Sequence, residues 1–180
     1  MNGLLLLCIH LIIAQPGEGT TYLIKNGKVS FRSDAPLELI EASSGKLNGV
    51  VDLSKNTFAF TIDINSFEGF NSPLQKEHFN ENYLESRKYK TATYLGKMIE
   101  KPDFTQDGDY IIRTKGVLTI HGVAQERIIK NEVNVEGNKM TIRSNFTVLL
   151  EEHDISIPKI VHQKIAEEIE VSIVAVAEKQ

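Results

Sequence analysis

The sequence predicts an all-β domain of antiparallel strands, and three observations support this. Apolar residues recur mostly with a period of two, which is the spacing of residues on one face of a strand. Turn-forming residues interrupt these runs at intervals suited to strands. Only one segment has the cap and the length of a helix. Because short loops join antiparallel neighbours, we expect the whole sheet to be antiparallel.

Each predicted strand is bounded by turn-forming residues. The predicted strands are 22–26, 28–33, 37–44, 45–52, 57–64, 91–100, 110–121, 124–135, 140–150 and 167–177. The predicted turns are Asn26-Gly27, Ser43-Ser44-Gly45, Asp52 to Asn56, Asp107-Gly108-Asp109 and Glu136-Gly137-Asn138. All of these connections are short enough for hairpins.

The strand at 57–64 shows the pattern most clearly, with Phe58, Phe60, Ile62 and Ile64 on one face and polar or small residues on the other. The strand that begins at Met140 repeats this alternation. Little helix is available to cover such an apolar face, so the sheet must curl or pack upon itself. Periodicity alone leaves a barrel and a sandwich open.

The helix is predicted in the long connection between strands 57–64 and 91–100. Ser72 supplies an N-cap, Pro73 a favourable first helical residue and Gln75 the last position of a capping box. We expect a helix from Pro73 to about Glu85, with an apolar side that can close one end of a barrel. That side carries Leu74, His78, Phe79 and Tyr83. A second helical turn is expected near 158–163.

The first residues have the composition of a signal peptide, with a short leucine-rich run that ends near Ala14. We expect residues 1–15 to be this leader and residues 16–180 to form one domain that is exported to the periplasm or secreted. No Lys or Arg precedes the leucines, which leaves the true N-terminus open. A buried first strand or helix is the alternative reading of this run.

Several function classes lack support in the sequence. Cys8 is the only cysteine and lies in the leader, so we expect no disulfide or thiol chemistry in the mature chain. The net charge of −4, with basic residues interspersed, offers no path for nucleic acid. No nucleophile, dinucleotide or metalloprotease motif is present, and we predict no catalytic residues and no metal site. The residues of Glu151-Glu152-His153-Asp154 cannot all converge on one ion from a strand end.

Three stretches together resemble the YceI-like family. They are Ser72-Pro73-Leu74-Gln75-Lys76-Glu77-His78-Phe79 through Tyr83, then Lys88-Tyr89-Lys90-Thr91-Ala92-Thr93-Tyr94, and then Gly116-Val117-Leu118-Thr119-Ile120-His121-Gly122-Val123. The chain departs from the family pattern where Gln75-Lys76 replaces an arginine-aspartate pair and where Lys90 replaces a strand proline. The resemblance implies an exported bacterial protein with an extended lipocalin-like barrel that binds a polyisoprenoid or another long-chain amphiphile.

On this interpretation the inward-facing side chains bind the apolar part of a long-chain lipid, such as a polyisoprenoid, an isoprenoid quinone or a fatty-acid derivative. The predicted ligand-binding residues are Phe58, Phe60, Ile62, Ile64, His78, Phe79, Tyr83, Leu118, Ile120, Ile142, Phe146, Val148, Ile169, Val171 and Ile173. No cofactor other than this ligand is expected. We expect no catalysis and, after leader removal, no membrane-spanning segment. A homodimer fits the sequence without being fixed by it.

Two alternatives remain open. The same side chains could fill a solid core, which would favour a structural or stress-related module that binds another protein. An enzyme that uses His78 or Tyr83 as acid or base on an apolar substrate is the other alternative.

Overall fold

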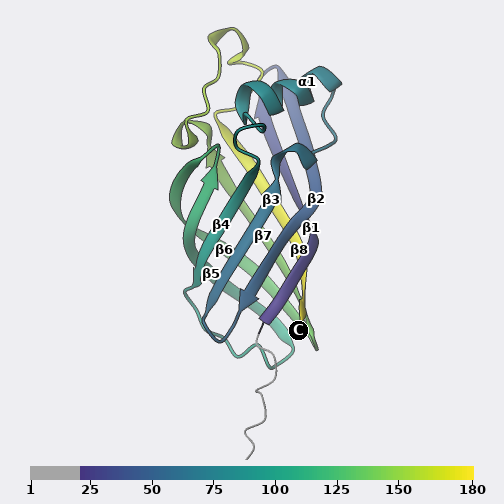
Figure 1. Cartoon of the computed structure of the whole chain (residues 1–180), viewed down its shortest axis with the longest axis vertical. Coiled ribbons are helices and arrows are strands. Elements are labelled where there is room, and N and C mark those ends of the chain that lie inside the picture. The colour runs from purple at the N-terminus through teal and green to yellow at the C-terminus, as the bar shows by residue number, and fades with distance from the viewer. Residues whose placement is uncertain (1–20) are drawn as a thin grey trace, which may run out of the picture.

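The strands pair in chain order and close into a barrel, which confirms the predicted antiparallel all-β fold (Figure 1). The computed structural model describes residues 21–180, and the predicted leader at 1–15 lies outside them. The strands are β1 (Thr21–Ala35), β2 (Glu38–Asp52), β3 (Thr57–Asp63), β4 (Thr91–Met98), β5 (Gly108–Ile120), β6 (Val123–Glu136), β7 (Lys139–Leu149) and β8 (Glu168–Lys179). Strand β8 pairs with β1 and thereby closes the sheet.

Two of the predicted turns are wrong, because the chain continues through them as strand. At Asn26 and Gly27 the register between β1 and β2 shifts, and Asn26 takes a left-handed conformation with φ of 57°. This is a β-bulge that bends β1 without reversing it. Ser43 and Ser44 stay paired with β1. The Ser44 side chain is buried and meets the Ser66 hydroxyl at 2.6 Å, so an inward polar residue is satisfied within a continuous strand.

The other predicted connections differ less from the structure. The turns at 52–56, 121–122 and 136–138 join β2 to β3, β5 to β6 and β6 to β7. Gly108 begins β5 instead of forming a turn, and a longer connection over residues 99–107 links β4 to β5.

The predicted helix is present as α1 (Pro73–His78), followed by one π-helical turn (Phe79–Tyr83). The Ser72 hydroxyl accepts a hydrogen bond from the backbone N–H of Gln75, as expected of an N-cap. The Gln75 side chain reaches back one residue further than in a capping box and accepts from Asn71 N–H. The second helical turn is also present as a 3-10 turn (Lys159–Val161).

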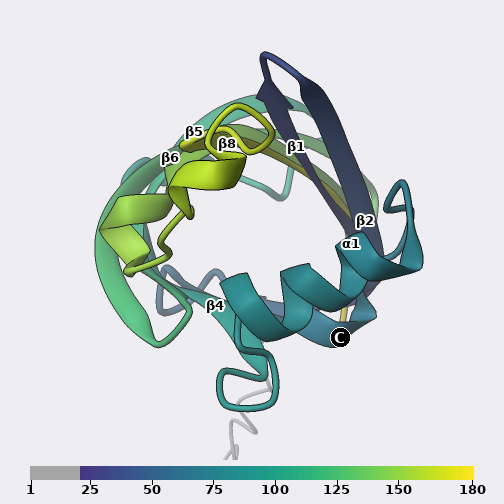
Figure 2. The same ribbon diagram turned by 90° about the horizontal axis from the view of Figure 1, so that it is seen from above.

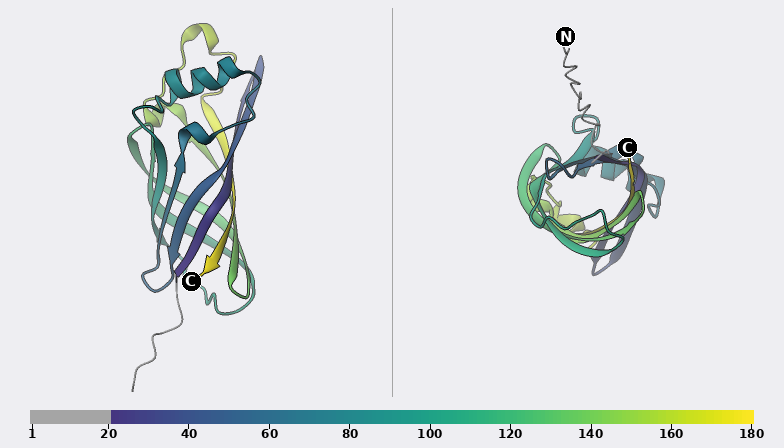
Figure 3. Two further views of the ribbon diagram at one scale, coloured as in Figure 1. Left: turned by 45° about the vertical axis from the view of Figure 1, so that its right-hand side comes forward. Right: turned by 90° about the horizontal axis from the view of Figure 1, so that it is seen from below.

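The barrel has two unlike ends. At one end, which we call the mouth, α1 and the β7–β8 connection lie across opposite sides of the barrel (Figure 2). The opposite end carries the short β2–β3 and β6–β7 hairpins and the C-terminus (Figure 3). No helix within residues 21–180 is long and apolar enough to span a membrane.

Candidate functional site

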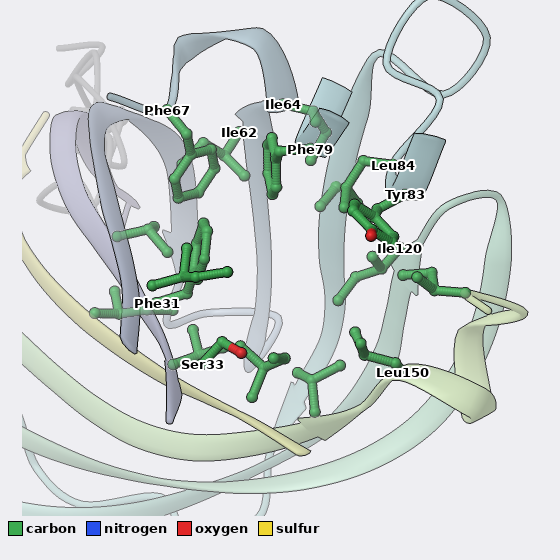
Figure 4. A pocket seen from close by; sticks show the side chains of 18 of the residues that line it. Phe31, Ser33, Ile62, Ile64, Phe67, Phe79, Tyr83, Leu84, Ile120 and Leu150 are labelled. Carbon is green, nitrogen blue, oxygen red and sulfur yellow. The ribbon is translucent and has the colours of Figure 1, made fainter. Parts of the chain in front are cut away.

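The mouth half of the barrel encloses a cavity of about 480 Å³. Its wall is mainly aliphatic and aromatic, and it extends to residues of α1 and of the β7–β8 connection, including Leu74 and Val161. Figure 4 shows Phe31, Phe67 and Phe79 on one side of this space and Tyr83, Ile120 and Leu150 on the other. A volume of this size is typical of small-molecule pockets, which span about 300–1,000 Å³. The solid-core alternative therefore does not describe the mouth half.

The opposite half of the barrel is solid. A small void of about 30 Å³ lies there among Phe58, Met98, Phe104 and Met140. Exposure along the inner face of β8 shows the change from hollow to solid. Ile169, Val171 and Ile173 line the cavity and are partly exposed, Ala175 lies at its floor, and Ala177 beyond it is 0% exposed.

A belt of buried polar side chains lies between the hollow and solid halves; it consists of Tyr94, Thr114, Asn131 and Ser144. The Ser144 hydroxyl donates to Asn131 Oδ1 at 2.6 Å, and Asn131 Nδ2 donates to Thr114 Oγ1 at 3.1 Å and to the Ile129 carbonyl at 3.0 Å. The Tyr94 hydroxyl completes the belt 3.1 Å from Thr114 Oγ1. All four side chains have partners within the protein, so the belt has no unpaired polar atom to offer a ligand.

The belt coincides with a fork in the sheet. The ladder between β6 and β7 runs from Glu136 and Lys139 to Asn131 and Ser144 and ends there. Beyond this pair the two strands part, and a 3-10 helix (Leu150–His153) lies beside β6. The barrel is therefore wider on the mouth side of the belt, which gives a physical reason why the cavity begins at this level.

Side chains bridge the fork where the backbone ladder is absent. Arg127 on β6 donates to the Thr147 carbonyl on β7 and forms an ion pair with Glu152 at 2.7 Å. Gln125 donates to the Glu152 carbonyl. Glu151-Glu152-His153-Asp154 thus lies largely in a helical turn rather than at the expected strand end, and Glu152 and His153 point to different partners, Arg127 and the Val123 carbonyl.

Aromatic rings attach the helical connection to the barrel wall. The Phe79 ring lies 5.4 Å from Phe31, 5.9 Å from Phe67 and 5.0 Å from Phe70, measured between ring centroids. We call α1 and the π-helical turn (Pro73–Tyr83) the lid. Because Phe79 belongs to the π-helical turn, this aromatic cluster holds the lid over the cavity through apolar contact.

Two histidines join the segment after the lid, the β5–β6 turn and the 3-10 helix (Leu150–His153) to one another. His121 Nε2 lies 2.8 Å from a Glu85 carboxylate oxygen, and His121 Nδ1 lies 3.0 Å from the His153 carbonyl oxygen. His153 is fully buried, with Nδ1 3.1 Å from the Val123 carbonyl oxygen. Burial lowers the pKa of His153 below its usual 6.5, although the backbone carbonyls of Val123 and Ile120 favour the protonated ring. His121 thus pairs with one backbone carbonyl and one carboxylate.

The charged and ionisable side chains of the lining lie toward the mouth, on the side of the cavity away from the belt. Glu38 accepts a hydrogen bond from Gln75 Nε2 at 2.9 Å, whereas His78, Tyr83 and Lys164 also line the cavity and face it without such a pairing. Burial raises the pKa of the Tyr83 hydroxyl above 10.0. An amphiphile can therefore place its polar end here and its apolar chain toward the belt.

Every predicted ligand-binding residue except Phe58 lines this cavity. The residues brought together are Phe60, Ile62, Ile64, His78, Phe79, Tyr83, Leu118, Ile120, Ile142, Phe146, Val148, Ile169, Val171 and Ile173. Phe58 does point inward, but it lies below the belt and packs against Tyr94 with ring centroids 4.8 Å apart. Alternation predicts which face a residue occupies, but it does not predict the level at which the barrel becomes solid.

Sequence reasoning missed the inner face of β1, including Phe31, and two further parts of the site. Phe67 and Phe70 lie in an irregular segment, where no period assigns a face. The belt had a readable signal: Thr114, Asn131 and Ser144 each occupy an inward position within an otherwise apolar alternation. Polar residues at such positions indicate a buried hydrogen-bond network.

Solved structures share this fold. A polyisoprenoid binding domain from Saccharophagus degradans, implicated in plant cell wall breakdown, superposes with a TM-score of 0.75 at 14% identity, covering 91% of this chain and 100% of that one. BcnA of Burkholderia cenocepacia gives 0.70 at 18% identity over 83% and 95%. A YceI protein of Campylobacter jejuni gives 0.57 at 16% identity over 99% and 94%. No curated protein matches the sequence.

The sequence pattern of the YceI-like domain matches residues 25–177, which covers nearly all of the described barrel. This match agrees with the three stretches quoted above and with the closed barrel that they imply. The chain belongs to the YceI-like family.

Proposed function

We propose that this protein binds a long-chain amphiphile, with the apolar chain inside the barrel and the polar end at the mouth, and carries it without altering it chemically. The hollow, apolar, one-ended cavity carries this proposal. Each methylene-sized group withdrawn from water contributes about 0.8 kcal/mol, so an enclosed chain supplies ample binding free energy. Polyisoprenoid binding by the similar Saccharophagus degradans domain supports the same ligand class.

The direct test is native mass spectrometry of the purified protein, followed by organic extraction of whatever is bound. We expect one long-chain lipid per barrel. An empty protein that also refuses added fatty acids and prenyl alcohols would contradict the proposal.

A matched pair of variants on β8 locates the site. Val171 lines the cavity, whereas Val174 faces outward and is 44% exposed. Val171→Trp places a large ring in the cavity and should weaken the binding of long chains, because it occupies part of the space of the chain. Val174→Trp adds the same ring to the outer surface and should bind like the wild type.

We further propose that His78 and Tyr83 contact the ligand without catalysing a reaction on it. Bound lipid should be recovered chemically unchanged after long incubation with the protein. His78→Gln and Tyr83→Phe should then alter affinity for the polar end and leave the composition of the recovered lipid as it was.

A further inference from the structure

The position of the polar belt limits how deep a ligand chain can reach. The belt follows the inner face of four neighbouring strands, β4 to β7, and Phe60, Asn131 and Ile142 line both the cavity above it and the 30 Å³ void below it. Below the belt Ile112, Val133 and Met140 are nearly inaccessible. A chain end that arrives at this level meets closed packing and polar groups whose hydrogen bonds are already made.

The depth of the hollow half follows from strand geometry. From Ser144 at the belt to Leu150 beyond the end of β7, the backbone spans roughly 20 Å at about 3.3 Å per residue. A strand tilt of about 40° reduces this to roughly 15 Å along the barrel axis. An extended hydrocarbon advances by about 1.3 Å per carbon, so this depth holds about 12 carbons, or about 16 if the chain follows the strands.

The cavity volume is consistent with one enclosed chain. It is about 480 Å³, within the range of about 300–1,000 Å³ for pockets that hold a single small ligand. A longer chain would have to leave its remainder in water at the mouth or fold back on itself.

On this basis, and given the proposed function, we infer that the barrel measures chain length. Its ligand is a single-chain amphiphile of about 12–16 main-chain carbons, which is the length of a common fatty acid or of roughly three or four isoprene units. The belt residues Tyr94, Thr114, Asn131 and Ser144, together with Phe60, form the stop.

The test is a series of unbranched fatty acids from about eight to about twenty-two carbons, measured by displacement of a fluorescent alkyl probe. We expect Kd to fall about fourfold for each added methylene until about 16 carbons and then to level off. Prenyl alcohols should level off at roughly four isoprene units. A Kd that keeps falling to the longest chains would overturn the length limit and leave the carrier function intact. If no chain binds at all, both proposals fail.

Variants should change the chain length at which Kd levels off, which we call the break, in a chosen direction. Ile173 lies opposite Ser144 on β8 and lines the cavity, so Ile173→Trp should shift the break to chains about two carbons shorter. Phe60→Ala joins the cavity to the void below and should shift the break to chains about three carbons longer. Val174→Trp on the outer face should leave the break where it is.

A break that stays fixed in both Ile173→Trp and Phe60→Ala would contradict the assignment of the stop. If Phe60→Ala does not fold, the shift of Ile173→Trp alone decides.

Discussion

The rings of Phe31 and Phe79 stack with their planes only 12° apart and their centroids separated by 5.4 Å. Phe31 belongs to β1 and Phe79 to the lid, so this contact joins a rigid wall to a short helical segment that has no buried residue of its own. The lid depends on this aromatic contact for its closed position, because a helix of this length is not stable by itself.

Removing the Phe79 ring should therefore speed ligand exchange. Aromatic pairs contribute about 0.5–1.5 kcal/mol each, and Phe79 contacts Phe31, Phe67 and Phe70. We expect Phe79→Ala to raise the dissociation rate of a bound fatty acid at least about tenfold, which corresponds to about 1.4 kcal/mol. Stopped-flow transfer to lipid vesicles measures this rate. Phe79→Leu keeps an apolar contact and should show a smaller increase. Equal rates in Phe79→Ala and the wild type would mean that the ligand leaves by another route.

The tight turn between β5 and β6 offers a test of packing against Tyr89, which lies between the lid and β4. Gly122 has φ of +75°, and a Cβ there would meet the Tyr89 ring at 2.3 Å. Gly137 in the β6–β7 turn has φ of +56°, and a Cβ there would meet no atom within 4 Å. Both Gly→Ala changes add about 1–2 kcal/mol of backbone strain, but only Gly122→Ala also forces Tyr89 away, at a further cost of about 1–3 kcal/mol.

Urea denaturation of both glycine variants measures these costs as free energies of unfolding. Gly45→Ala is a control for both, because Gly45 has no positive φ and a Cβ there would meet no atom within 4 Å, so this change should be close to neutral. If Gly122→Ala and Gly137→Ala lost the same free energy of unfolding, the Tyr89 ring would move aside at no energetic cost.

The burial of His153 should make stability depend on pH. Its folded pKa is lowered because the ring is removed from water, so the unfolded chain binds a proton in a pH range where the folded chain does not. The buried neutral ring therefore contributes its full share to the free energy of unfolding above pH 6.5. This contribution is lost as the pH falls below that value toward the pKa of the folded state.

Urea midpoints between pH 7.5 and pH 5 test this expectation. The midpoint of the wild type should fall across this range, and a His153→Gln variant should show a smaller fall whatever its absolute stability. His162 is exposed, so His162→Gln should keep the wild-type slope. A wild-type slope that persists in His153→Gln would assign the pH dependence to other groups.

Much of the barrel can be predicted from local signals, because each strand carries its own alternation. The alternation of β3 and β7 identifies their inner faces residue by residue, and the N-cap at Ser72 locates the lid. The errors occur where a tertiary contact overrides a local turn signal. Asn26-Gly27 has the composition of a hairpin turn, but β1 stays paired with β8 beyond it and the signal produces a bulge.

The candidate site is less predictable than the fold for a related reason. Whether an inward side chain lines a cavity or a solid core depends on the distance to the opposite wall, which no single strand encodes. Ile142 and Phe58 have the same alternation, yet only Ile142 reaches the cavity. The deciding feature is the fork at Asn131 and Ser144, which arises from pairing between distant segments.

Arg127 provides the last prediction, because it replaces missing backbone pairs at that fork. Its guanidinium joins the Thr147 carbonyl to the Glu152 carboxylate, and both Arg127 and Glu152 are partly buried. Arg127→Ala leaves an edge carbonyl and a carboxylate without this partner, and we expect a loss of about 1–2 kcal/mol in the free energy of unfolding. Arg127→Lys should recover little, since one ammonium group cannot reproduce the planar fork that serves both acceptors.

Lys130 lies on the same strand and is exposed, so Lys130→Ala should cost much less. Hydrogen exchange of the β7 amides from 145 to 149 should rise in Arg127→Ala alone, whereas unchanged exchange would show that the 3-10 helix holds the fork without Arg127.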